Sequence, residues 1–369
     1  MVDDHRQSAS EQRNTETHTT WHSHQTSGIM LEISEPMWGN RVGRLRAINT
    51  AGVPQTRNVS GERSSPATVA QKLLMAIQIL TGCCQSHLAA LADESVHTCV
   101  TSPPYWGLRD YGHAAQLGLE PTPDEFVRNL VAVFREVKRV LRDDGTLWLN
   151  LGDSYANGGC GTRDEKRWPK QSRNDHMPAH AKKQTGVKTK DLIGVPWRVA
   201  FALQEDGWFL RSDIIWHKTN PMPESVCDRP TKAHEYLFLL SKFERYFYDS
   251  NAIREPRVQR SIVSLPTTNR THTLLGRNKR TVWTMPTQPF SQAHFATFPP
   301  KLIEPCILAG CPAGGTVLDP FFGAGTTGLV ADRLGRHCVG IELNPEYVAI
   351  AEERLRRDAG MFADVVVAA

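Results

Sequence analysis

The chain lacks the features that define several classes of protein. None of its eight cysteines stands in a Cys-x-x-Cys pair, so they predict neither a disulfide framework nor a zinc site, and indicate reduced, buried thiols. No apolar run approaches the roughly 18 residues of a membrane helix. The first residues are polar and hold no apolar stretch for a signal peptide. We therefore expect a cytoplasmic protein with no metal centre and no membrane partner.

A strong charge imbalance is also absent. The chain has 43 Lys and Arg against 39 Asp and Glu, a formal net charge of +4. This weak basic excess permits a nucleic-acid partner but does not imply one. Hydrophobic residues make up 40% of the 369 residues, which is typical of a globular protein with one large domain or two ordinary ones. We find no internal repeat.

The chain divides by composition near residue 70. Residues 1–70 are rich in Ser, Thr, Asn, Gln and Arg and poor in apolar residues, so we expect a disordered or loosely attached tail. Beyond it, strands alternate with helices, which predicts a parallel, doubly wound α/β sheet. The expected strands are 73–82, 97–100, 146–151, 209–218, 235–242, 315–321 and 337–343, and the expected helices are 86–96, 123–141, 195–207, 329–335 and 345–357.

Two stretches carry surplus positive charge and no periodicity. Residues 156–190 form a loop rich in Gly, Lys and Arg, which either clamps a phosphate backbone or is a simple insertion. Residues 251–290 hold seven basic residues against a single acid, Glu255. Arginine side chains in such a stretch either read guanine edges and hold phosphates, or belong to a solvated loop.

A glycine-rich turn lies between the strand and the helix near residue 323. Gly323, Gly325 and Gly328 form the pattern G-x-G-x-x-G, and Glu342 ends the following strand. This arrangement predicts a nucleotide-type ligand over the turn, with its ribose diol on Glu342. No Lys follows the glycines, which excludes a P-loop. Asp319 would repel a pyrophosphate and suits an ammonium group, so S-adenosylmethionine is favoured over NAD, although the turn alone leaves both open.

The sequence Thr-Ser-Pro-Pro-Tyr at 101–105 follows the expected strand 97–100. Prolines remove backbone donors and leave carbonyl acceptors. The Ser102 oxygen and the Pro103 carbonyl can hold the two hydrogens of an exocyclic amine and direct its lone pair toward a methyl donor. The ring of Tyr105 can stack on a base that has left the duplex. The stretch therefore predicts methyl transfer to a base amine, largely through positioning.

Three motifs together resemble a known family. TSPPY, with DPFFGAGTTG and GIELNPEY further on, is similar to the amino-methyltransferases of DNA, which carry [S/D/N]PP[Y/F] as catalytic motif and DPFxGxGTT as cofactor motif. The catalytic motif comes first here, which resembles the permuted beta group. The resemblance covers about residues 74–357. It implies a Rossmann-like fold with permuted motif order, in which 77–82 is the third sheet strand and the chain ends after the second.

The resemblance also implies the parts of the site and of the chain. It implies catalytic residues Ser102, Pro103, Pro104 and Tyr105, and cofactor-binding residues Phe298, Asp319, Pro320, Phe321, Gly323, Gly325, Thr326, Thr327, Glu342 and Asn344. It places DNA-binding residues in a small target-recognition region at 251–290, for which we expect Arg277, Lys279 and Arg280. Residues 71–250, including the loop 156–190, would be the catalytic part of the methyltransferase domain, and 291–369 its cofactor-binding part.

The expected activity is site-specific methylation of double-stranded DNA by S-adenosyl-L-methionine. Ser in first place is typical of cytosine-N4 enzymes, and adenine N6 is the alternative. Relatives usually have an acceptor Asp after the strand that here ends in Gly82-Cys83-Cys84. A catalytically weakened DNA-binding protein is therefore a second alternative. An NAD-dependent dehydrogenase is a third alternative. The family implies a cytoplasmic location in a bacterial, archaeal or phage-infected cell, and it permits a cognate restriction endonuclease and a homodimer as partners.

Overall fold

The computed structural model describes residues 77–108, 116–156, 186–256, 276–288, 298–359 and 364–368. All of them belong to Arg63–Ala369, one of the two units into which the chain divides. The expectations for residues 1–70 and for most of the loop 156–190 lie outside the described residues. In the described part of the chain, no helix combines the length and the apolar character needed to cross a membrane.

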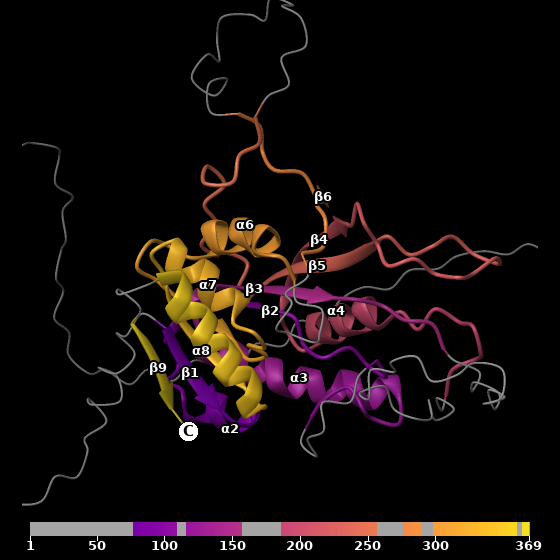
Figure 1. Ribbon diagram of the computed structural model, residues 1–369, viewed down its shortest axis with the longest axis horizontal. Helices are drawn as coiled ribbons and strands as arrows, with labels where there is room; N and C mark the ends of the chain where they lie inside the picture. The colour runs from indigo at the N-terminus through magenta and orange to yellow at the C-terminus, as the bar shows by residue number, and fades with distance from the viewer. Residues whose placement is uncertain are drawn as a thin grey trace, which may run out of the picture. The chain divides into compact units, whose positions relative to one another are not determined.

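A nine-stranded sheet forms the centre of the described unit (Figure 1). Its strands lie in the order β6-β4-β5-β3-β2-β7-β8-β1-β9. Their bounds are β1 Ile77–Thr81, β2 Val96–Thr101, β3 Leu141–Leu151, β4 Phe209–His217, β5 His234–Ser241, β6 Val282–Thr284, β7 Thr316–Asp319, β8 His337–Glu342 and β9 Val365–Ala368.

Strand direction in this sheet confirms the doubly wound prediction. From β3 through β2, β7, β8 and β1 to β9 every neighbouring pair is parallel. β5 is antiparallel to both of its neighbours, β3 and β4. The expectation that the chain adds no strand after 337–343 is wrong, because β9 pairs with β1, with Val365 opposite Ile77. β6 and β9 have only three and four residues, too few to show a period in the sequence.

Helices cover both faces of the sheet. α2 Cys84–Ala90, α3 Pro123–Val140 and α4 Val195–Glu205 pack on one face, and α6 Pro300–Gly310, α7 Thr326–Arg333 and α8 Pro345–Ala359 on the other (Figure 1). No helix was expected at α6, whose sequence contains two prolines. Pro300 occupies the first turn, where its missing N–H costs no hydrogen bond, but Pro305 lies inside the helix.

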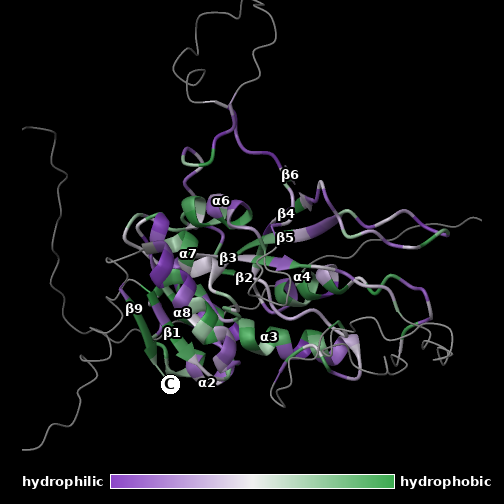
Figure 2. Ribbon diagram, viewed as in Figure 1, coloured by the Kyte–Doolittle hydropathy of each residue, from purple (hydrophilic) through white to green (hydrophobic). Residues whose placement is uncertain are grey.

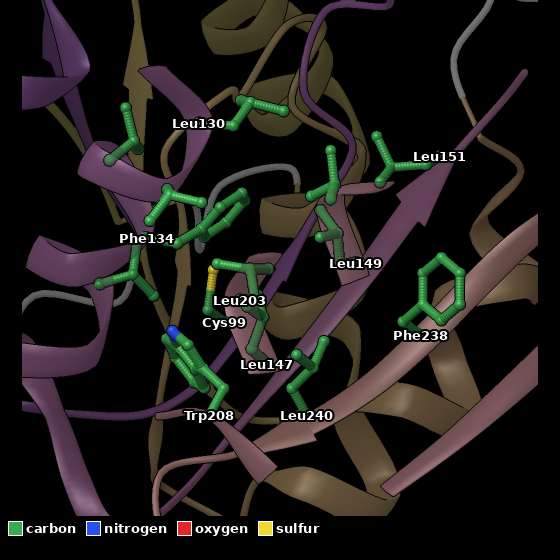
Figure 3. Packing of buried hydrophobic residues seen from close by; sticks show 14 of the residues in the cluster. Cys99, Leu130, Phe134, Leu147, Leu149, Leu151, Leu203, Trp208, Phe238 and Leu240 are labelled. Carbon is green, nitrogen blue, oxygen red and sulfur yellow. The ribbon is translucent and has the colours of Figure 1, made fainter. Parts of the chain in front are cut away.

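Helix α3 shows how local sequence determines these elements. The Thr122 side chain accepts a hydrogen bond from the Glu125 amide at 3.2 Å, and Pro123 begins the helix. Hydrophobic and hydrophilic residues alternate within the turns of the helix, which places them on different faces (Figure 2). Its apolar stripe, including Leu130 and Phe134, packs against Cys99 and the leucines of β3 (Figure 3).

Residues 143–145 lie within β3, at an irregularity of its pairing with β2. Val96 pairs with Leu141 but Thr98 pairs with Thr146, so β3 carries extra residues where the ladder shifts. After the shift the two strands stay in register to their carboxyl ends, where Thr101 pairs with Leu149. In open parallel sheets ligands bind at this edge, which here collects the ends of β2, β7, β8 and β1.

Candidate active site

A buried carboxylate joins the two motifs that the sequence singled out. Asp319 ends β7, and its side chain accepts hydrogen bonds from the Thr101 hydroxyl (2.6 Å), the Thr327 hydroxyl (2.6 Å) and the Phe321 amide (3.0 Å). Thr101 immediately precedes Ser102, and Thr327 lies in the first turn of α7. The Asp319 carboxylate therefore holds the Ser-Pro-Pro-Tyr strand and the glycine turn side by side, although 218 positions separate Thr101 from Asp319.

Burial governs the ionisation of this carboxylate. Asp319 is 1% exposed, and loss of solvent raises its pKa to about 6 against the opposing effect of its three donors. These donors leave part of the oxygen acceptor capacity unused. The expected contact between Asp319 and a ligand ammonium group stays a prediction.

The glycine turn has two residues with left-handed backbone. Gly323 has φ +51° and Gly325, which caps α7, has φ +75°. A Cβ added to Gly325 would lie 3.0 Å from the Ala351 Cβ and 3.3 Å from the Phe322 ring, so it would point at α8. A Cβ added to Gly323 would meet nothing within 4 Å. The open side of the turn is therefore at Gly323.

Phe322 is a packing residue that the sequence motif did not distinguish from its neighbour. It is 3% exposed, and its ring fills the space above Gly328 and Gly340, where an added Cβ would lie 2.7 and 2.3 Å from ring atoms. The third glycine of the pattern thus serves helix–strand packing. Phe321 is half-buried and packs against the cluster on the α3 side of the sheet, while Phe298 is half-buried against the α6 side.

Glu342 organises the turn from the neighbouring strand. Its carboxylate accepts the Gly323 amide at 2.7 Å and the Asn344 amide at 2.9 Å. Burial raises the pKa of Glu342, and these backbone donors oppose the rise. The Asn344 side chain accepts the Glu346 amide at 2.9 Å in the first turn of α8. Both residues stand at the carboxyl edge of the sheet. Their contact with a cofactor stays a prediction.

The remaining motif residues face the protein interior. Thr327 is fully buried on Asp319, and its hydroxyl also lies 3.4 Å from the Val100 carbonyl. The Thr326 hydroxyl accepts a hydrogen bond from Arg354 at 2.9 Å. Pro320 is buried directly after Asp319. Thr326, Thr327 and Pro320 therefore shape the turn through contacts within the protein.

The catalytic motif leaves β2 at the same edge. Ser102 and Pro104 are half-buried and Pro103 is buried. The Tyr105 hydroxyl donates to a carboxylate oxygen of Glu235 at 2.7 Å. Glu235 lies near the start of β5 and was not among the expected site residues; the signal that could have found it is that it is the single acid of a mostly apolar strand.

Two other residues near the motif have structural partners. Trp106 is 3% exposed, and its indole N–H donates to the Glu120 carbonyl at 2.8 Å, so its ring belongs to the core. Lys218, which directly follows β4, donates to Glu235 at 2.5 Å. The structure therefore connects Lys218 to the catalytic motif through Glu235.

The Gly82-Cys83-Cys84 stretch ends β1 beside the strand of Glu342. The Gly82 amide donates to the Glu342 carbonyl at 2.8 Å, and Cys83 is the half-buried residue before α2. Burial raises the pKa of Cys84 to about 12, so this thiol stays protonated. Cys83 thus lies just after β1, next to the residue that contacts the backbone of Glu342.

Two arginines of the expected recognition region pair with its one acid. Glu255 accepts hydrogen bonds from Arg277 at 3.0 Å and Arg280 at 3.3 Å, and the Lys279 ammonium lies 4.7 Å from the centre of the Trp283 ring. Trp283 is 4% exposed and packs in the core. Because β6 runs parallel to β4, these basic residues precede the strand and approach it from the side opposite to the carboxyl edge.

Solved structures of similar proteins share this fold. TTHA0409 of Thermus thermophilus, solved in complex with S-adenosyl-L-methionine, is 25% identical with a TM-score of 0.50, over 79% of this chain and 99% of that one. The PvuII DNA methyltransferase (cytosine-N4-specific) is 21% identical with a TM-score of 0.53, over 75% of this chain and 85% of that one. The fold is that of the S-adenosylmethionine-dependent DNA methyltransferases, as predicted.

The sequence comparisons define the family. Residues 96–353 match the model of the N6/N4 family described as DNA methylase, and the chain belongs to this family. The Type II methyltransferase M.SmaI of Serratia marcescens is 50% identical over 77% of this chain and 92% of its own length. M.Cfr9I of Citrobacter freundii is 51% identical over 80% of this chain and 95% of its own length. The predicted family is thereby confirmed.

Proposed function

We propose that this chain is a site-specific DNA methyltransferase that transfers a methyl group from S-adenosyl-L-methionine to cytosine N4. The observation that carries the proposal is the buried junction of Thr101, Asp319 and Thr327, which places the Ser-Pro-Pro-Tyr strand directly beside the glycine turn. A methyl donor on the turn and a base amine at Ser102 would then be neighbours. Family membership and the S-adenosyl-L-methionine complex of TTHA0409 support this cofactor.

The chain's own residues would act on the base rather than on the methyl group. The Ser102 oxygen and the Pro103 carbonyl accept the two amine hydrogens, which turns the nitrogen lone pair toward the donor. When bound, the cofactor supplies an electrophilic methyl on a sulfonium. The amine would take up this methyl group while Ser102 and Pro103 hold its hydrogens, and its surplus proton would leave to solvent. No charged base is needed, because positioning carries the reaction.

The described residues also suggest how the cofactor would be held. Gly323 offers the open side of the turn, Glu342 stands where a ribose diol would bind, and Asp319 provides negative charge for an ammonium group. Phe298 and Phe321 would flank the ligand with half-buried rings. The free amides at the start of α7 add a favourable dipole end.

The raised pKa of Asp319 makes the affinity for cofactor depend on pH. An ionised Asp319 attracts the ammonium group, so we expect tighter binding as the pH rises through about 6. The stability of the free protein depends on pH in the opposite direction, because a protonated Asp319 is favoured in the folded state. This contribution to the free energy of unfolding is complete below the ordinary pKa of 3.8 and is lost as the pH rises through about 6. Calorimetric titrations with cofactor from pH 5 to 8 should show affinity rising with pH in the wild type. The rise should be smaller in Asp319→Asn, which retains Glu342. Parallel affinity profiles in the two proteins would remove Asp319 from the ligand site.

Cytosine N4 is proposed because Ser occupies the first position of the motif. Adenine N6 is the alternative within the same family, and Cys83 is the argument for a catalytically weakened protein. DNA methylated in vitro with labelled cofactor can be digested to nucleosides and analysed by mass spectrometry. We expect labelled N4-methylcytosine. Labelled N6-methyladenine would show that the target is adenine N6 instead. Absence of label from every nucleoside would favour a catalytically weakened DNA-binding protein.

We further propose that Arg277, Lys279 and Arg280 bind DNA. Arg280 is 69% exposed although it contacts Glu255, so its guanidinium can reach a partner. If Arg280 reads a base edge, Arg280→Ala should lose about 1–3 kcal/mol of discrimination between bases and methylate a broader set of sequences. If Arg280 holds a phosphate, the variant should bind all DNA more weakly, and its affinity should depend less on salt concentration. Methylation of a randomised-site library at several salt concentrations separates these outcomes. Arg135→Ala is a matched control, since Arg135 is 65% exposed and paired with Asp206; equal profiles for both variants would exclude Arg280 from recognition.

The biological setting is proposed from the relatives. M.SmaI and M.Cfr9I bear the name Type II methyltransferase, which supports a cognate restriction endonuclease as the partner of this chain. We also propose that the chain has the permuted motif order, acts in the cytoplasm and forms a homodimer.

A further inference from the structure

A row of polar side chains crosses four neighbouring strands at the carboxyl edge. Tyr105 follows β2, Asn150 lies on β3, Glu235 on β5, and Lys218 follows β4, in the spatial order of the strands. Because β5 is antiparallel, its first residues lie where β2, β3 and β4 end. The order of the strands, rather than nearness in sequence, therefore brings these four side chains together.

The Glu235 carboxylate is the centre of this row. One oxygen accepts the Tyr105 hydroxyl at 2.7 Å and the Asn150 amide at 3.2 Å, and the other accepts the Lys218 ammonium at 2.5 Å. Asn150 is 2% exposed and also donates to the Tyr236 carbonyl at 3.0 Å. The side chains of Glu235 and Lys218 are 14% and 19% exposed, so the charged pair is little screened by solvent. Donors from three directions thus fix the orientation of the carboxylate.

A second contact restricts the Tyr105 ring itself. A Cβ added to Gly152 would lie 2.4 Å from the ring Cε2, so the ring rests against the Gly152 backbone. Glu235 accepts the hydroxyl at 2.7 Å, the Asn150 amide oxygen is a more distant acceptor at 3.4 Å, and Gly152 supports one side of the ring. These contacts determine the plane of a ring that would otherwise rotate about its side-chain bonds.

We propose that Glu235 is a positioning residue that holds the Tyr105 ring in the plane on which the extruded target base stacks. This inference rests on the proposed function, in which Ser102 to Tyr105 receive the base. Lys218 and Asn150 orient the carboxylate, the carboxylate anchors the hydroxyl, and Gly152 supports the ring. Glu235 itself touches neither base nor cofactor, and its effect on methyl transfer passes through the Tyr105 hydroxyl.

Two different substitutions, one at each end of the Tyr105–Glu235 hydrogen bond, should lower kcat in the same way. Tyr105→Phe removes only the hydroxyl and keeps the ring, while Glu235→Ala removes its anchor. Each should lower kcat on the order of tenfold to a hundredfold, because loss of orientation acts on the reacting geometry. Affinity for S-adenosyl-L-methionine should stay within about twofold of wild type, since the glycine turn is untouched. The double variant should be no slower than the slower single variant.

The test is a double-mutant cycle on total transfer of tritiated methyl groups to DNA, which scores cytosine and adenine alike. Asp206→Ala is the matched control: this carboxylate is 12% exposed and binds Arg135 at 2.6 Å, away from the motif, and its loss should leave kcat unchanged. Thermal melting identifies any variant that loses its fold. If Glu235→Ala fails to fold, Tyr105→Phe alone still decides the test. Unchanged kcat in Tyr105→Phe, or effects that multiply in the double variant, would overturn the proposal. A wild-type chain that transfers no methyl group would instead refute the proposed function.

Discussion

Ser102→Ala should lower methyl transfer by about a hundredfold or more while cofactor affinity changes little. The Ser102 oxygen is proposed to accept an amine hydrogen of the target base, and removing one preorganised hydrogen-bonding group typically costs that much. The cofactor would lie on the glycine turn, which Ser102 does not contact in the proposed arrangement. Single-turnover transfer of tritiated methyl groups measures the first quantity, and calorimetry with S-adenosyl-L-methionine measures the second.

The other end of the same strand offers a matched control. Ser95 lies just before β2, is half-buried like Ser102, and donates to the Ala92 carbonyl at 2.7 Å. Ser95→Ala should therefore leave both transfer and cofactor binding near wild type. Equal turnover in Ser102→Ala and Ser95→Ala would remove the serine from the mechanism.

Gly325→Val should abolish measurable cofactor binding. Its φ of +75° is costly for any other residue, by about 1–3 kcal/mol, and an added Cβ would crowd Ala351 and the Phe322 ring. The turn and α8 would have to move apart. Because this variant also loses stability, Gly323→Ala is the more specific probe: its added methyl meets no protein atom within 4 Å and points where the ligand is proposed to lie.

Gly335 supplies the control for this comparison. It has φ +67° and nothing within 4 Å of an added Cβ, but it follows α7 at the end away from the glycine turn. Gly323→Ala and Gly335→Ala should cost a similar, small amount of stability, about 1 kcal/mol. Only Gly323→Ala should weaken binding of S-adenosyl-L-methionine in calorimetry. Equal affinity in both variants would place the cofactor elsewhere.

The sequence was most informative where a signal is local. The helix expected at 123–141 and the glycine pattern before α7 both depend on neighbouring residues, and the structure contains each of them. The strand alternation likewise predicted the parallel sheet. Short or proline-containing elements, such as β6, β9 and α6, were missed because their stability comes from pairing or packing with distant segments.

The internal contacts of the candidate site could not be predicted, because they join residues far apart in the chain. Thr101 and Thr327 meet on Asp319 only because β2 and β7 are neighbours in the sheet. Glu235 reaches Tyr105 because β5 runs against the other strands. The sequence motifs named the residues at the edge, whereas their partners depend on strand order. The division into catalytic, recognition and cofactor-binding parts stays a prediction.

Single-molecule sequencing of DNA from a methylation-free host that expresses this chain tests the central claim most directly. We expect N4-methylcytosine at one recurring sequence, and no modification in cells that express Ser102→Ala. The Ser95→Ala variant should reproduce the wild-type pattern, which ties the modification to the end of β2. DNA without any modified base in wild-type cells, or equal modification with Ser102→Ala, would contradict the account.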